Sequence, residues 1–121
     1  MYAVLRKSWS SSTAYKSCQS EWVSEDPSYG QCAITATLVY DMFGGSIHRI
    51  RVEGGGTHYF NKITGQYVDL IREQFDLYNI EVAYEPNETM QREYCCKNPD
   101  TNARYRQLQR NIIAYLKNNE D

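Results

Sequence analysis

Three side chains in the middle of the chain have the types needed for nucleophilic chemistry at a carbonyl carbon. Cys32 precedes an apolar segment, and His58 and Asp69 follow it in that order. Acyl chemistry by a thiol requires a thiolate, a base that accepts and returns a proton, and donors that stabilise an oxyanion. The order therefore predicts a nucleophile, its base and an acid that orients the base.

Cys32 stands at the start of a segment that predicts a buried helix. Apolar residues between Ala33 and Phe43 fall on most of the helix circumference, which is typical of a helix surrounded by other elements. Gly44 and Gly45 are expected to end this helix, since glycine readily adopts the left-handed closing conformation. A cysteine in the opening turn faces the positive end of the helix dipole, which favours thiolate over thiol.

His58 and Asp69 lie on the two arms of a predicted β-hairpin. The arms are expected at residues 57–61 and 66–70. Residues 62–65 form the expected turn, with a glycine at its last position.

The hairpin predicts which side chains share a face of the sheet. With a symmetric turn, His58 is expected opposite Asp69, and Phe60 opposite Tyr67, all on one side. Asn61 has the other parity and is expected to point away from His58. Asp69 is therefore the better candidate to orient His58.

Four further residues are candidates for oxyanion stabilisation or substrate binding. Gly30 permits close approach of a backbone, and Gln31 offers its N–H or its side chain beside the N–H of Cys32. Phe60 and Tyr67 are expected to wall a cleft beside His58, although core packing is the simpler role for both rings.

Each member of the predicted triad also has a structural interpretation. Cys32 is the kind of small residue that cores bury, and His58 and Asp69 form a pair that stabilises many folds. Their combination in this order favours the catalytic interpretation. His48 has charged neighbours in sequence and is expected at the surface, and Asp41 is expected to be a local hydrogen-bonding partner.

The four cysteines do not predict a disulfide framework or a metal site. They are Cys18, Cys32, Cys95 and Cys96, and without an export signal reduced thiols are expected. The adjacent pair, Cys95 and Cys96, lacks the gap of about two to four residues that zinc ligands have. A redox or metal role for this pair remains a third hypothesis for the protein.

Four further elements are expected from periodicity and from helix-breaking residues. They are a helix from about Ser10 or Ser11 to Cys18, a strand at 46–53, a short helix at 88–95 and a helix from 98 to about 117. Trp9 and Trp22 are expected to anchor the N-terminal segment on the core.

Composition predicts one ordinary globular domain over residues 1–121. The chain is 41% hydrophobic and 23% charged, with a net charge of −2, so charge gives no reason to expect nucleic acid as a partner. No apolar run approaches the roughly 20 residues of a membrane span. The N-terminal apolar stretch is too short for a signal peptide. We therefore expect a cytoplasmic protein that binds neither nucleic acid nor membrane, and the oligomeric state is left open.

Several short motifs together resemble the YunG-like family of small uncharacterised bacterial proteins. The resemblance is most specific from Tyr29 to Phe75. The matching pieces are the Trp9 region, Asp26-Pro27-Ser28, Gly30-Gln31-Cys32-Ala33, Asp41 with Gly44-Gly45, His58-Tyr59 with Asn61, Asp69-Leu70, Gln74-Phe75, and Arg104-Tyr105 with Leu108. That family brings no settled activity with it.

The cysteine helix, its Gly-Gly exit and the His–Asp hairpin also look like the core of papain-like and transglutaminase-like domains. This second resemblance implies an α+β fold in which a buried central helix packs on an antiparallel sheet, with further helices at both ends. It implies Cys32 as nucleophile, His58 as base and Asp69 as orienting acid. Phe60 stands where such a pattern leads us to expect Trp, and Ile71 where a Thr commonly follows the aspartate.

The sequence favours a cysteine-dependent acyl-transfer enzyme. Amidase, deamidase, peptidase and transglutaminase-type reactions all fit, on a peptide or a small molecule that carries a carboxamide. No metal or organic cofactor is required by this chemistry. The alternative is a non-catalytic binding or regulatory module that has the same fold.

Overall fold

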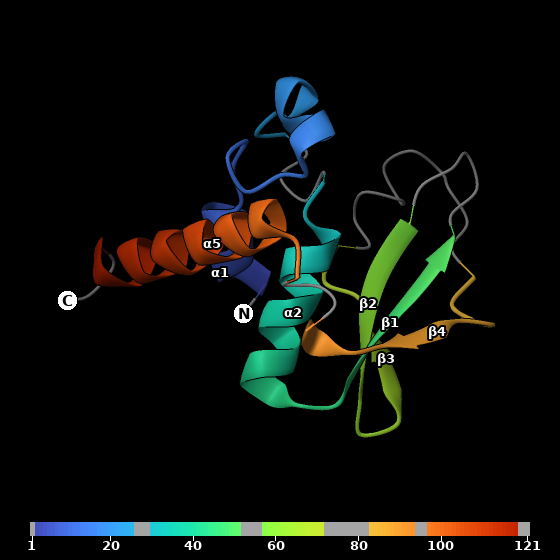
Figure 1. The fold of residues 1–121 in the computed structure, drawn as a ribbon. Helices are drawn as coiled ribbons and strands as arrows, with labels where there is room; N and C mark the ends of the chain where they lie inside the picture. The colour runs from blue at the N-terminus through green and yellow to red at the C-terminus, as the bar shows by residue number, and fades with distance from the viewer. Residues whose placement is uncertain (1, 26–29, 52–56, 72–82, 94–96, 119–121) are drawn as a thin grey trace.

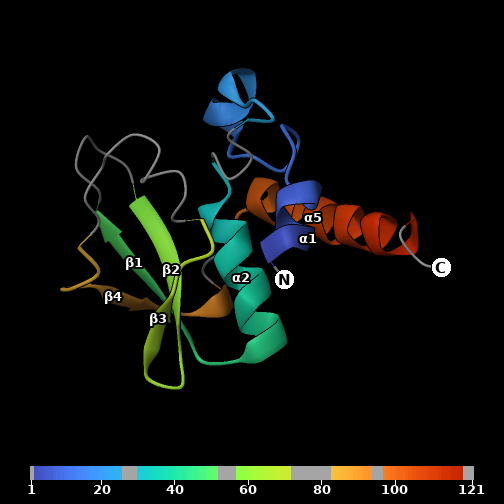
Figure 2. The ribbon, with the colours of Figure 1, turned by 180° about the vertical axis from the view of Figure 1, so that it is seen from behind.

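Helix α2 (Cys32–Phe43) lies at the centre of the molecule. The protein is described by a computed structural model over residues 2–25, 30–51, 57–71, 83–93 and 97–118. Figures 1 and 2 show α2 between a four-stranded antiparallel sheet and two helices, α1 (Tyr2–Ser8) and α5 (Pro99–Asn118). The expected α+β arrangement, with a central helix on an antiparallel sheet, is confirmed.

The central helix is buried on several sides, as its sequence predicts. Ile34 and Leu38 pack toward α1 and α5, whereas Ala36 packs toward the sheet. Gly44 ends the helix with φ of 77°, and its N–H donates to the carbonyl of Tyr40 at 2.9 Å. The left-handed glycine at this position is the predicted stop.

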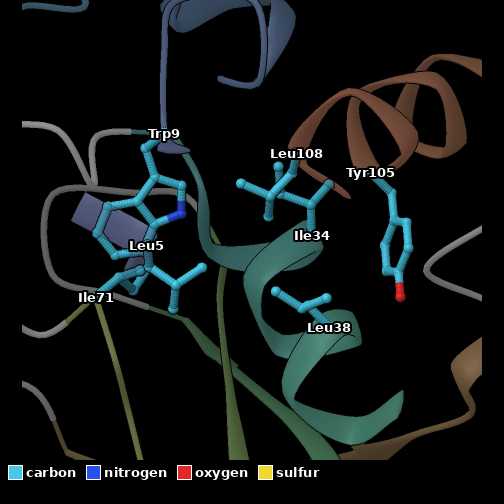
Figure 3. Close-up of a cluster of buried hydrophobic side chains, with 7 residues drawn as sticks. All are labelled: Leu5, Trp9, Ile34, Leu38, Ile71, Tyr105 and Leu108. Carbon is cyan, nitrogen blue, oxygen red and sulfur yellow. The ribbon is translucent and has the colours of Figure 1, made fainter. Parts of the chain in front are cut away.

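The main hydrophobic cluster joins α2 to both helices beside it (Figure 3). Its members are Leu5, Trp9, Ile34, Leu38, Ile71, Tyr105 and Leu108. Trp9 also donates its indole N–H to the hydroxyl of Thr35 at 3.0 Å. The N-terminal segment is therefore anchored on the first turns of α2, which confirms the role expected for Trp9.

The sheet has the strand order β3-β2-β1-β4, and every neighbouring pair is antiparallel. The strands are β1 (Ser46–Arg51), β2 (Thr57–Ile63), β3 (Gln66–Val68) and β4 (Glu88–Met90). One face packs on α2 through Ile47 and Tyr59. Asn61 is on the same face and donates its amide to the carbonyl of Ala36 at 2.9 Å, so it points away from His58 as predicted.

The hairpin turn is shorter than the sequence analysis predicts. Ile63 pairs directly with Gln66, so the turn consists of Thr64 and Gly65 and not of residues 62–65. Both turn residues are left-handed, with φ of 51° and 78°. Two successive left-handed residues make the tight turn whose twist matches that of paired strands.

The shorter turn moves the register by two residues. Tyr67 lies opposite Lys62 and not opposite Phe60, and Asp69 lies beyond the end of β3 rather than in the ladder opposite His58. The predicted pairing is therefore wrong. A shift of two residues preserves the face on which each side chain lies, so His58 and Asp69 still meet on one side of the sheet.

The helix predicted from about residue 10 to Cys18 is not present. Thr13 donates its N–H to the carbonyl of Ser10 at 3.2 Å, and its hydroxyl accepts the N–H of Ser10 at 2.9 Å. A short 3-10 helix, η1, follows at Lys16–Glu21. Hydroxyl side chains that bond the local backbone compete with helix formation. The serine-rich stretch makes a turn for this reason.

The prediction of a short helix at 88–95 is also wrong for its first three residues, which form a strand. Glu88–Met90 form β4 and pair with Ile47, His48 and Arg49 of β1. The open edge of β1 offers backbone partners that a local propensity for helix does not outweigh. Residues 94–96, which include Cys95 and Cys96, lie outside the described residues.

The helix predicted from 98 to about 117 is confirmed by α5. Asn98 accepts the N–H of Asp100 at 2.8 Å, which is the capping contact expected before the first turn. Tyr105 and Leu108 are its buried apolar residues. Among the helices that the structure describes, none has both the length and the apolar character needed to cross a membrane.

We predict that Gly45→Ala destabilises the protein much more than Gly44→Ala. Both glycines have nearly the same φ, 77° and 79°, so both substitutions strain the backbone. A Cβ on Gly45 would lie 2.2 Å from the carbonyl oxygen of Lys62, whereas a Cβ on Gly44 meets nothing within 4 Å. Urea unfolding should give a further loss of about 1–3 kcal/mol for Gly45→Ala. Equal losses would mean that the helix end does not depend on this approach to β2.

Candidate active site

Cys32 is the first residue of α2 and is half-buried. Its thiol lies 3.7 Å from the carbonyl oxygen of Thr57, the residue that precedes His58 on β2. The first backbone bond of this helix end joins the N–H of Thr35 to the carbonyl of Gln31 at 3.0 Å. The N–H of Cys32 therefore has no acceptor within the helix, as is usual for the opening turn.

His58 and Asp69 form a buried pair. Nε2 of His58 lies 2.7 Å from Oδ2 of Asp69, and the side chains are 2% and 5% exposed. Asp69 also accepts the N–H of Ile71 through Oδ1 at 3.2 Å and the hydroxyl of Tyr84 through Oδ2 at 2.9 Å. The carboxylate is therefore held by donors from three places in the chain.

The charge of His58 is set by its neighbours. Burial lowers the pKa of the imidazole, but hydrogen bonds to Asp69 and Cys32, with the negative charge of each partner, outweigh this and raise the pKa from 6.5 to about 9. His58 therefore carries a proton at neutral pH. Because Nε2 is hydrogen-bonded to Asp69, Nδ1 is the ring nitrogen available to interact with the sulfur.

Gly30 and Gln31 connect the start of α2 to the N-terminal segment. Gly30 has φ of 76°, and a Cβ there would lie 3.0 Å from the Cβ of Cys18. Gln31 is fully buried, and its side chain accepts from Thr13 at 2.7 Å and donates to the carbonyl of Ser10 at 3.1 Å. These contacts fix the approach to the first turn, and the oxyanion role of both residues stays a prediction.

Phe60 and Tyr67 belong to an aromatic cluster beside His58. Phe60 is 1% exposed and stacks on His58 with ring centroids 6.1 Å apart. Tyr67 and Tyr84 both meet Phe60 edge-on, at 5.4 and 4.9 Å. Phe60 is therefore a packing residue under the imidazole, and Tyr67, which is half-buried, is the more accessible of the two predicted wall residues.

His48 lies on the same face and is buried, so its expected surface position is wrong. It is 7% exposed and stacks on the other side of the cluster against Phe60 at 5.8 Å. Nε2 lies 2.6 Å from the hydroxyl of Ser46, and Nδ1 lies 2.9 Å from Oδ1 of Asn87. Since a carbonyl oxygen only accepts, Nδ1 donates its proton to Asn87.

Asp41 makes long-range contacts where local ones were expected. Its carboxylate forms two hydrogen bonds with Arg92 at 3.0 and 2.9 Å and accepts a short one from Tyr105 on α5. The Arg92 contact, partly opposed by burial and aided by Tyr105, lowers the pKa of Asp41. This cluster joins the end of α2 to two distant segments and is separate from the cysteine.

Sequence analysis did not find Tyr84, which contacts Asp69. Tyr84 lies outside the hairpin, and nothing in its local pattern predicts a contact with a residue fifteen positions earlier. A cavity of about 510 Å³ lies near the same segment and is lined by Thr57, Arg51, Glu85 and Glu88 among others. Thr57 lines this cavity and its carbonyl contacts Cys32, but none of the three triad residues is among the described residues that line the cavity.

Comparisons with known proteins identify the family. A family model described as YunG protein matches residues 1–117. The chain belongs to the YunG family. A Bacillus subtilis (strain 168) relative, described as uncharacterized protein YunG, is 40% identical over 72 residues. That match spans 60% of this chain and 57% of the relative, and no solved structure matches the chain.

We predict that the protein loses stability as the pH rises from about 7 to about 10. The folded pKa of His58, about 9, lies above the unfolded value of 6.5, so the folded state binds more protons between these values. The stabilisation is complete below pH 6.5 and is lost as the pH passes 9. Denaturant unfolding at a series of pH values should show this slope in the wild type and a smaller one in His58→Gln. An equal slope in both proteins would contradict the assignment to His58.

Proposed function

We propose that this YunG-family protein is a cysteine-dependent acyl-transfer enzyme, with Cys32 as nucleophile, His58 as proton carrier and Asp69 as the residue that orients His58. One observation carries the proposal. His58 is bonded to Asp69 through Nε2 and also interacts with Cys32, and both partners favour its protonated form. A thiol, an imidazole and a carboxylate in this sequence of contacts form the usual arrangement of an activated thiol nucleophile.

The proposed reaction has two steps. The sulfur of Cys32 attacks a carboxamide carbonyl, and Nδ1 of His58 gives its proton to the departing amine as the C–N bond breaks. The acyl group is then held as a thioester. Water or a second amine attacks this thioester, His58 accepts the proton of the attacking molecule and returns one to the sulfur, and the acid or the new amide is released.

The opening turn of α2 supplies the proposed oxyanion donors. The N–H of Cys32 has no acceptor within the helix, and the positive end of the helix dipole lies at the same place. The backbone N–H of Gln31 is the second candidate. Burial and hydrogen bonding of the Gln31 side chain support this use, because they hold its backbone in place.

We also propose that the core is papain-like or transglutaminase-like. The order of elements supports this: a cysteine at the start of the central helix, a Gly-Gly exit, and an antiparallel sheet whose strands bring histidine and aspartate together. The likeness concerns the site and its supporting elements, and a substrate does not follow from it.

The proposed substrate is a peptide or small molecule that carries a carboxamide. The cavity beside Thr57 supports a polar substrate, because both Arg51 and Glu85 line it. No step of the reaction calls for a metal or an organic cofactor. The proton and the leaving group are handled by Cys32 and His58.

A non-catalytic binding module is the second candidate, and the burial of the site favours it. Only 2% of the His58 side chain is exposed, so a substrate must reach the imidazole past the half-buried sulfur. In such a module the cavity near Thr57 would still accept a ligand, but Cys32 would form no acyl intermediate.

Acylation of Cys32 by an activated ester separates the two candidates. We predict that p-nitrophenyl acetate acetylates Cys32 at least about a hundredfold faster than Cys18, since acid–base assistance contributes roughly 10²–10⁴. Both thiols are half-buried, so Cys18 is an internal control, and mass spectrometry of peptides after quenching reads each one. Hydroxylamine should release the acetyl group from Cys32 as a hydroxamate.

Two variants control this experiment. His58→Gln should slow acetylation of Cys32 to the rate of Cys18. His48→Gln removes the other buried histidine, which does not contact the sulfur in the described structure, and should leave the rate unchanged. Equal acetylation of Cys32 and Cys18 in the folded wild type would overturn the enzyme proposal and leave the binding module.

A further inference from the structure

The proposed mechanism leaves one structural question open, namely what holds the Asp69 carboxylate in position. Asp69 follows the last residue of β3, so no ladder pairing fixes it. Its oxygen Oδ2 accepts two hydrogen bonds, from Nε2 of His58 at 2.7 Å and from the hydroxyl of Tyr84 at 2.9 Å. The same atom that orients the imidazole is therefore also held by a phenol.

Tyr84 is itself fixed by contacts on several sides. Its ring stacks on Tyr67 at 5.9 Å and meets Phe60 edge-on at 4.9 Å. Its carbonyl accepts the amide of Asn87 at 2.7 Å. The phenol thus reaches Asp69 from a ring whose position is set by packing and by the backbone that leads into β4.

We propose that Tyr84 is a positioning residue of the Cys32–His58–Asp69 site, whose hydroxyl holds Oδ2 of Asp69 beside His58 and limits the negative charge that this oxygen presents to the imidazole. The inference rests on the proposed function, since it assigns a further residue to the same site. Tyr84 does not contact the sulfur or the reacting carbonyl in this scheme, and it acts through Asp69.

Because Tyr84 and His58 both donate to Oδ2 of Asp69, the hydroxyl of Tyr84 should affect the pH at which His58 loses its proton. A second donor on Oδ2 disperses part of the carboxylate charge, so the attraction between Asp69 and protonated His58 is weaker than it would be without the phenol. Removing the hydroxyl should therefore raise the pH at which His58 loses its proton. A residue that only filled space would leave this pH where it is.

The other charged and titratable groups near the cluster do not compete for Oδ2 in the described structure. Cys32 meets His58 from the start of α2, and His48 is separated from it by the ring of Phe60. Lys62 lies over the ring of Tyr67 at 5.2 Å, and Glu85 accepts the hydroxyl of Tyr67 at 2.6 Å.

Tyr67 provides a matched control for Tyr84. The two rings stack on each other, both meet Phe60 edge-on, and each hydroxyl donates to a carboxylate. The hydroxyl of Tyr67 goes to Glu85, whereas that of Tyr84 goes to Asp69. Tyr84→Phe and Tyr67→Phe therefore each remove a hydroxyl from the same aromatic cluster, but only Tyr84→Phe removes a hydrogen bond from Asp69.

The test is an NMR titration of the two histidine rings in the wild type and both variants, with His48→Gln used to assign the signals. In Tyr84→Phe the midpoint for His58 should move up by about half a pH unit or more, and in Tyr67→Phe it should stay within about 0.2. In an Asp69→Asn background, Tyr84→Phe should have no effect on the midpoint, because the charge on which it acts is gone.

Every other result counts against the inference. An unchanged or lowered midpoint in folded Tyr84→Phe, or the same change in both variants, would show that the phenol does not tune the pair. A Tyr84→Phe protein that fails to fold would assign the hydroxyl to the fold and not to the site. The titration does not depend on turnover, so failure of Cys32 to form an acyl intermediate would remove the enzyme proposal separately.

Discussion

The contact between Nε2 of His58 and Oδ2 of Asp69 is the interaction on which the site depends. It joins a residue near the start of β2 to one just past β3, and both groups are almost completely buried. A carboxylate removed from water in this way is costly unless it is paired and hydrogen-bonded. Three donors meet that need, and one of them is the imidazole that faces Cys32.

Helix α2 provides the other constraint. Trp9 and the hydrophobic cluster hold its first turns against α1 and α5, while Ala36 packs against the sheet and accepts a hydrogen bond from Asn61. The close approach of Gly45 to Lys62 fixes the opposite end. With both ends held, the sulfur at the start of the helix lies against the first residue of β2.

The features that the sequence predicts well are those with a local cause. The buried helix and its glycine stop follow from a dense apolar pattern and from glycine's access to positive φ. The common face of His58 and Asp69 also survives an error in the turn, because the register moved by an even number of residues. His48 could have been placed correctly too, since Arg49 alternates to the other face of the strand.

The features that the sequence does not predict depend on distant partners. Glu88–Met90 form a strand because they pair with the edge of β1, and the local sequence does not predict that pairing. Tyr84 reaches Asp69 only because the chain returns alongside the hairpin before β4. The oxyanion roles of Gly30 and Gln31 remain proposals because they concern a reacting molecule and not the chain itself. The papain-like core remains a proposal because no solved structure matches the chain.

The most direct measurement is a double-mutant cycle on the alkylation rate of Cys32 by iodoacetamide at neutral pH, using the wild type, His58→Gln, Asp69→Asn and the double variant. Groups that act as one unit are strongly non-additive. We expect His58→Gln alone to slow alkylation by at least about tenfold, and the double variant to be no slower than that single variant. Rate losses that multiply, or a wild-type rate equal to that of Cys18, would show that the sulfur, the imidazole and the carboxylate do not work together.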